Sequence, residues 1–113
     1  MNIINQSREL TKMELYKLTE GKKTVSVKDA VGLTFRVNAW CEYEDENERG
    51  DKSHVLSILA TDGSVYTTVS DVFRRSFMRI LKIFGDDLPE IEIEILDGET
   101  KNGRTYYDCT AID

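Results

Sequence analysis

An amphipathic helix predicted between two groups of strands constrains the fold of this chain most. The helix signal runs from Ser70 to Gly85. Ser70 or Asp71 can accept hydrogen bonds from the unpaired amides of the first turn, and Gly85 is typical of the residue that ends a helix. Large apolar residues recur at helical spacing and share one face: Phe73, Phe77, Ile80, Leu81 and Phe84. This face must pack on a large apolar surface.

Extended segments on both sides of the helix supply that surface. Alternating apolar and polar residues, with turn signals at Asp62-Gly63 and Asn102-Gly103, predict three strands before the helix and two after it. The strands are residues 33–43, 55–60, 65–69, 90–96 and 105–112. This order predicts a mainly β fold, a five-stranded β-barrel with the helix between strands 3 and 4 and plugging its base.

The first long strand has two distinct faces. One face is apolar and is expected to point into the core: Leu33, Phe35, Val37, Ala39, Cys41 and Tyr43. The other face carries Thr34, Arg36, Asn38, Trp40 and Glu42. A cation, an amide and the single tryptophan of the chain suit contact with a ligand. Trp40 could instead close a barrel end or cover a neighbouring loop.

A short second helix is predicted near the amino terminus. Thr11 and Glu14 have the spacing of a capping box before residues 12–19, and Gly21 is a stop signal. A helix this short needs a partner surface, so it should pack on the barrel, on a second copy or over the open barrel end. We expect one domain, residues 1–113, with residues 1–23 as a helical extension packed on the barrel.

The formal net charge of −6 argues against nucleic-acid binding through bulk charge alone. The first third of the chain is nevertheless basic, which leaves room for a local positive surface: Arg8, Lys12, Lys17, Lys22, Lys23, Lys28 and Arg36. No apolar run is long enough to span a membrane, and the amino terminus lacks a secretory signal. We expect a soluble protein in the cytoplasm, with Cys41 and Cys109 as small buried residues in a reducing compartment.

Catalytic and cofactor motifs are not evident. His54 is the single histidine and has no partner that spacing identifies. Phosphate loops, zinc-ligand pairs and dinucleotide fingerprints are also missing from the sequence. Glu92 and Glu94 share one strand face and could bind a divalent metal, but such a face is usually solvated. The sequence therefore favours a binding protein without a cofactor over an enzyme.

Aromatic rings and cations on strands suit unpaired bases and their phosphates. On the predicted strand faces the candidate DNA-binding residues are Arg36, Asn38, Trp40, Lys52, His54, Tyr66, Lys101, Arg104 and Tyr106. A second basic stripe lies on the long helix at Arg75, Arg79 and Lys82. That stripe is either a solvated helix face or a contact with DNA or an acidic partner.

Four parts of the chain carry a family resemblance: residues 5–11 with 14–19, residues 35–40, residues 60–66 and residues 101–107. They resemble the small single-stranded DNA-binding proteins of bacteriophages that infect Gram-positive bacteria. The resemblance implies an oligonucleotide-binding (OB-fold) barrel that coats unpaired DNA in phage replication or recombination. It also implies phage or host replication or recombination proteins as possible partners in the host-cell cytoplasm. A barrel this small offers one binding surface, and linking several surfaces raises affinity, so we expect a homodimer or larger homo-oligomer with the amino-terminal helix or a strand edge at the contact.

Two other functions are compatible with the residues. Acidic faces at residues 44–51 and at Glu90, Glu92 and Glu94 could mimic nucleic acid and block a basic host DNA-binding protein. Alternatively, the same barrel could be an accessory subunit that makes protein contacts alone.

Overall fold

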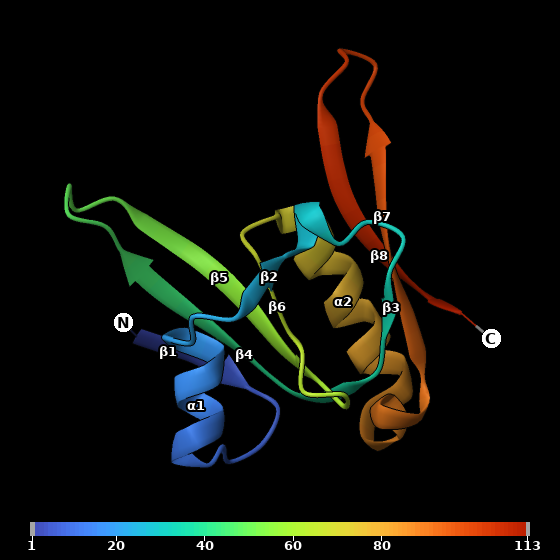
Figure 1. The fold of residues 1–113 in the computed structure, drawn as a ribbon. Coiled ribbons are helices and arrows are strands. Elements are labelled where there is room, and N and C mark those ends of the chain that lie inside the picture. The colour runs from blue at the N-terminus through green and yellow to red at the C-terminus, as the bar shows by residue number, and fades with distance from the viewer. Residues whose placement is uncertain (1, 113) are drawn as a thin grey trace.

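The computed structural model describes residues 2–112, which form two β-sheets and two α-helices (Figure 1). The strands are β1 (Asn2–Gln6), β2 (Thr24–Ser26), β3 (Thr34–Phe35), β4 (Val37–Glu46), β5 (Lys52–Ala60), β6 (Val65–Thr68), β7 (Glu92–Glu99) and β8 (Thr105–Ile112). The helices are α1 (Lys12–Thr19) and α2 (Asp71–Phe84), with short 3₁₀ helices η1 (Val27–Asp29) and η2 (Gly85–Glu90). The predicted mainly β fold with helices is confirmed. Met1 and Asp113, the ends of the predicted domain, lie outside the described residues.

The strands do not close into the predicted five-stranded barrel. Sheet A has the order β1-β4-β5-β6-β2, and sheet B has the order β3-β7-β8. The amino-terminal segment adds a strand at each end of sheet A: β1 pairs with β4, and β2 runs parallel to β6. Because β2 occupies the edge of β6, that edge is not open to a last barrel strand.

A bent strand connects the two sheets. β3 pairs with β7 in sheet B, β4 pairs with β5 in sheet A, and Arg36 alone separates β3 from β4 along the chain. Helix α2 lies between the two sheets (Figure 1). The sheets therefore share one covalent corner and one helix.

An extra residue in β4 reverses its side-chain alternation. Val37 lies opposite Ala60 and Ala39 lies opposite Leu59, so Asn38 has no partner of its own on β5. A bulge of this kind exchanges the two faces of the strand beyond it. The inward and outward alternation of side chains before the bulge therefore does not continue beyond it.

β4 is buried on both faces, and the reversal decides which residues lie on each face. Beyond the bulge, Ala39, Cys41 and Tyr43 pack with Leu18 of α1, whereas Trp40 joins Phe35 and Val37 in the cluster around α2. The prediction that Trp40 and Glu42 face outward is wrong, since they are 7% and 6% exposed. The predicted core face is buried except at Leu33, which is 51% exposed.

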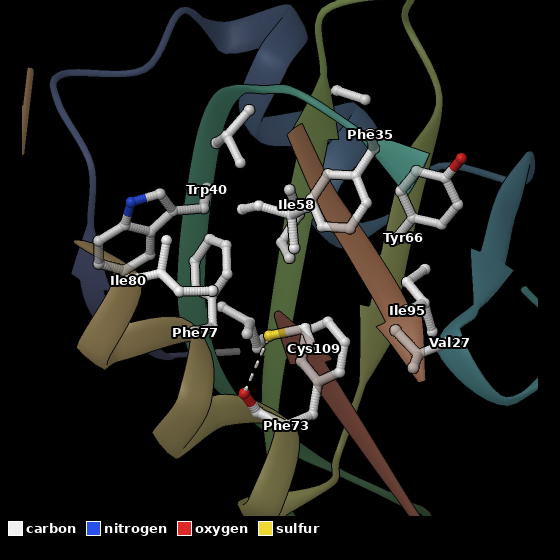
Figure 2. Packing of buried hydrophobic residues seen from close by; sticks show 14 of the residues in the cluster. Val27, Phe35, Trp40, Ile58, Tyr66, Phe73, Phe77, Ile80, Ile95 and Cys109 are labelled. Carbon is white, nitrogen blue, oxygen red and sulfur yellow. Dashed lines mark hydrogen bonds between the residues drawn. The ribbon is translucent and has the colours of Figure 1, made fainter. Parts of the chain in front are cut away.

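Helix α2 has the predicted limits, and on its predicted apolar face Phe73, Phe77 and Ile80 are buried while Leu81 and Phe84 are partly buried. The predicted placement of the helix at the base of a barrel is wrong, because it lies between two sheets that form no barrel (Figure 1). The Ser70 hydroxyl accepts a hydrogen bond from the Phe73 amide at 3.2 Å, and the Gly85 amide donates to the Leu81 carbonyl at the other end. Phe73 and Phe77 are fully buried (Figure 2). Cys109 of β8 lies against the same helix, with its Sγ 3.8 Å from the Phe73 carbonyl oxygen.

Both cysteines are buried and free of disulfide bonds, as the sequence predicts. Burial raises the pKa of the Cys41 thiol to about 11 and that of Cys109 to about 12. Both side chains are therefore protonated packing groups at neutral pH.

Replacing Phe77 by Ala should lower the free energy of unfolding by about 3 to 5 kcal/mol, because it leaves a cavity at the centre of the core. Denaturant titration measures the loss, and emission of the adjacent Trp40 reports unfolding. Ile83→Ala is a control on the same helix: Ile83 is 77% exposed, so the change should stay within about 0.5 kcal/mol. A loss below about 1 kcal/mol for Phe77→Ala would contradict its position in the core.

Helix α1 begins with the predicted capping box. The Thr11 hydroxyl accepts from the Glu14 amide at 3.1 Å, and the Glu14 carboxylate accepts from the Thr11 amide at 2.9 Å. Arg8 also donates two hydrogen bonds to the Glu14 carboxylate, at 2.9 and 2.7 Å. These bonds from Arg8 and then from Thr11 lower the pKa of Glu14 from 4.5 to about 2.

Glu14→Gln should reveal this linkage between protonation and stability. The pKa of Glu14 is lower in the folded than in the unfolded chain, so its stabilisation is complete above its ordinary pKa of 4.5 and is lost as pH falls towards about 2. Urea titrations across this pH range should show the wild type more stable than the variant at pH 7, with the difference shrinking in acid. A difference that stays constant with pH would contradict the role of the pair.

Candidate nucleic-acid interface

Two of the nine predicted DNA-binding residues are buried. Trp40 meets Phe77 edge-on, with ring centroids 6.2 Å apart, and Tyr66 lies 5.1 Å from the Phe35 ring (Figure 2). The predicted outward orientation of Trp40 and Tyr66 is therefore wrong. Trp40 turns inward because of the bulge at Asn38, and Tyr66 lies opposite Ile58 on the sheet face that packs on α2. In this structure neither ring is open for a base to stack on it.

Two further predicted residues face carboxylates on the β4–β5 hairpin. The Lys52 Nζ lies 3.5 Å from Glu44, and the His54 Nε2 lies 2.5 Å from the Glu42 carboxylate. Both contacts are diagonal across the hairpin, because the register places Lys52 opposite Glu46 and His54 opposite Glu44. The cationic character of this hairpin is therefore offset by its own acids.

Arg36 and Asn38 are exposed at the corner between the sheets. The Asn38 side-chain oxygen accepts a hydrogen bond from Arg8 at 3.1 Å. Asn38 and Arg8 line a groove of about 550 Å³ whose wall includes Trp40 and Leu88. The bulge that buries Trp40 thus also presents Asn38 to solvent.

The β7–β8 hairpin holds the other three predicted residues near its tip. Lys101 and Arg104 lie in the turn, are exposed and make no ion pair within residues 2–112. Tyr106 is 37% exposed and lies opposite Gly98. A Cβ atom at Gly98 would be 2.5 Å from the Tyr106 Oη, so the missing side chain makes room for the ring. The hairpin therefore presents an exposed aromatic ring, packed over Gly98, beside two cations that have no ion-pair partner in the described residues.

The predicted residues do not form one continuous surface. The tips of the β4–β5 and β7–β8 hairpins point away from the body in different directions (Figure 1). Arg36 lies at the opposite end of β5 from Lys52, because its carbonyl accepts a hydrogen bond from Thr61 after β5 ends. Sequence reasoning placed these residues together through the closed barrel, which the strands do not form.

Two residues of the basic stripe on α2, Arg75 and Arg79, face Asp108 of β8. Arg75 and Arg79 line a small cavity of about 250 Å³ together with Asp108. The Arg75 Nε also donates to the Asp71 carbonyl at 3.3 Å. Arg75 therefore has a backbone partner on its own helix, and both arginines lie near one acid of β8.

A groove beside α1 was missed by the sequence reasoning. It measures about 470 Å³, and we call it the α1 groove; its lining residues are Met13, Tyr16, Lys17, Gly21, Lys22, Lys23, Gly63 and Val65. The basic character of the first third of the chain was the available signal. The missing information was that the β5–β6 turn, distant in sequence, lies against this helix.

Comparison with known protein families finds a match over residues 4–109 to the family described as phage single-stranded DNA-binding protein. The match covers most of the chain. The protein belongs to the phage single-stranded DNA-binding protein family. The resemblance drawn from the sequence is therefore confirmed. No curated protein and no solved structure matches the chain significantly.

Metal-ligand clusters and membrane-spanning helices are both absent from the described part of this phage single-stranded DNA-binding protein. Within residues 2–112, no group of three or more His, Cys, Asp or Glu side chains is arranged to hold a metal ion. No helix in the same described part is long and apolar enough to cross a membrane.

Proposed function

We propose that this protein binds single-stranded DNA without sequence preference and coats it during phage replication or recombination in the host cytoplasm. The observation that carries the proposal is the family match over residues 4–109. Phage or host replication and recombination proteins would be its protein partners.

The β7–β8 hairpin supports the proposal with suitable chemistry. The exposed Tyr106 ring offers a flat surface to a base, and Lys101 and Arg104 can contact the adjacent phosphates. Stacking tolerates any base because every base has a flat face, so it supplies affinity without sequence readout. Arg36 and Asn38 are exposed at the sheet corner and are proposed as further contacts.

The other predicted residues are weaker candidates for direct contact. Lys52 and His54 would have to exchange Glu44 and Glu42 for phosphates. Trp40 and Tyr66 are buried in the core. We assign these last two residues a packing role.

Titration with fluorescent oligothymidine, and with duplex of the same length, at two salt concentrations tests the proposal. Single strands should bind more tightly than duplex, and affinity should fall as salt rises because condensed counterions are released. Tyr106→Ala should lose about 1 to 3 kcal/mol of binding free energy. Emission from the buried Trp40 should change little on binding.

Matched variants sharpen the same experiment. Gly98→Ala keeps the Tyr106 side chain but displaces its ring, so it should weaken binding in the same direction as Tyr106→Ala. Lys52→Ser removes a cation that is already paired and should matter less than Arg104→Ser. If the folded protein failed to bind oligothymidine at low salt, the proposal would be wrong. Capture of a basic host protein in that case would favour the acidic-mimic alternative.

We also propose that the protein assembles into at least a dimer. β1 and β8 are terminal strands of sheets A and B, and a terminal strand can pair with a strand from another copy. Linking several binding surfaces raises the affinity for one long strand. Sedimentation at concentrations on the order of tens of micromolar should show a species larger than 13.0 kDa. A single species of monomer mass would contradict this assembly.

A further inference from the structure

The α1 groove combines exposed apolar and aromatic side chains with a basic rim. Met13 is 62% exposed and Tyr16 is 53% exposed, and the two lie one helical turn apart on the same face of α1. Large apolar side chains left in solvent as neighbours commonly mark a contact surface. Lys17, Lys22 and Lys23 surround them, and no Asp or Glu is among the residues that line the groove.

The two walls of the groove are held in place by close backbone packing. At the end of α1, a Cβ atom on Gly21 would lie 2.6 Å from the Lys17 carbonyl oxygen, so the chain can turn this tightly because residue 21 is glycine. Immediately afterwards, Thr24 of β2 pairs with Val65 of β6. The backbone at Lys22 and Lys23 is thus held between the helix end and the sheet, and both side chains are exposed.

The local charge favours an anionic occupant although the whole chain is acidic. Lys17, Lys22 and Lys23 make no ion pair within the described part of the chain. Glu14, the acid in the first turn of α1, is engaged by Arg8 and by the Thr11 amide. Three lysines without ion-pair partners in the described residues therefore line a groove that also contains an exposed aromatic ring.

We infer that the α1 groove is a second contact site for single-stranded DNA, separate from the β7–β8 hairpin. A base stacks on Tyr16 against Met13, and Lys17, Lys22 and Lys23 contact the phosphates on either side. This inference rests on the proposed function. A flat ring beside cations matches unpaired DNA, which carries both a flat base and a charged phosphate at every nucleotide.

The position of the groove predicts how a strand runs over the protein. α1 lies on the opposite side of the molecule from the tip of the β7–β8 hairpin (Figure 1). One long strand would therefore pass across the body to reach both sites, and a short oligonucleotide would occupy one of them at a time. The affinity gain with strand length should depend on Tyr16 and on Tyr106 together.

The experiment compares variants of the full chain in binding to a long fluorescent oligothymidine. Tyr16→Ala should weaken binding about fivefold to a hundredfold, and Tyr16→Phe should retain wild-type affinity because the ring is kept. The triple variant Lys17→Ser, Lys22→Ser and Lys23→Ser should reduce the slope of log affinity against log salt by about 2. Its control, Lys12→Ser with Lys28→Ser and Lys82→Ser, removes the same charge outside the groove and should leave the slope much closer to wild type.

Photocrosslinking gives a readout independent of affinity. Oligothymidine carrying 5-iododeoxyuridine should crosslink to the peptide that contains Tyr16, as identified by mass spectrometry. Circular dichroism confirms that each variant is folded, which is expected because all the replaced side chains are exposed.

The outcomes separate this inference from the proposed function. If the wild type binds and Tyr106→Ala weakens binding, but the α1-groove variants stay within twofold and no crosslink reaches Tyr16, the groove is not a DNA site. If the wild type does not bind oligothymidine at all, both proposals are wrong. If Tyr16→Ala converts an oligomer to a monomer and no crosslink reaches Tyr16 in the wild type, the groove is a contact between copies and the inference is overturned.

Discussion

The packing of Phe73 and Phe77 between the two sheets is the interaction on which the rest of the structure depends. Phe77 contacts Trp40 of sheet A, and the carbonyl of Phe73 meets Cys109 of sheet B. Each sheet has a face that would be exposed without α2. In the described residues, no strand of one sheet pairs with a strand of the other sheet. The two sheets are therefore held together by packing on this helix, and not by the strand-to-strand hydrogen bonds that would close a barrel.

The bulge at Asn38 decides which side chains are left for binding. It turns Trp40 towards α2 and leaves the preceding Arg36 and Asn38 in solvent. It also lets β4 bury a different set of residues against α1 on its other face. One extra residue in a strand thus removes an aromatic ring from the surface and supplies α1 with a sheet on which to pack. Among the described residues, the aromatic rings left exposed are then Tyr16 on α1 and Tyr106 on the β7–β8 hairpin.

An acidic protein can bind a polyanion if its cations are arranged locally and are not already paired. Lys52 and His54 lie opposite carboxylates on their own hairpin, whereas Lys101 and Arg104 lie in a turn without such partners among the described residues. Total charge governs long-range attraction, but contact energy depends on the groups within a few ångströms. The cross-strand register therefore decides which basic residues are available to bind phosphate, although all of them look equivalent in the sequence.

The sequence by itself determined those features that depend on residues close together in the chain. These are the limits and buried face of α2, the capping box of α1, and the turns at Asp62-Gly63 and Asn102-Gly103, all governed by local hydrogen bonds and helical periodicity. The family resemblance also followed from short segments. Tertiary structure alone decided the inward turn of Trp40, the division of the strands into two sheets that do not close into a barrel, and the α1 groove. Each of these depends on which distant strand pairs with which and in what register, and a shift of one residue, as at Asn38, exchanges the two faces of a strand without leaving a mark in its composition.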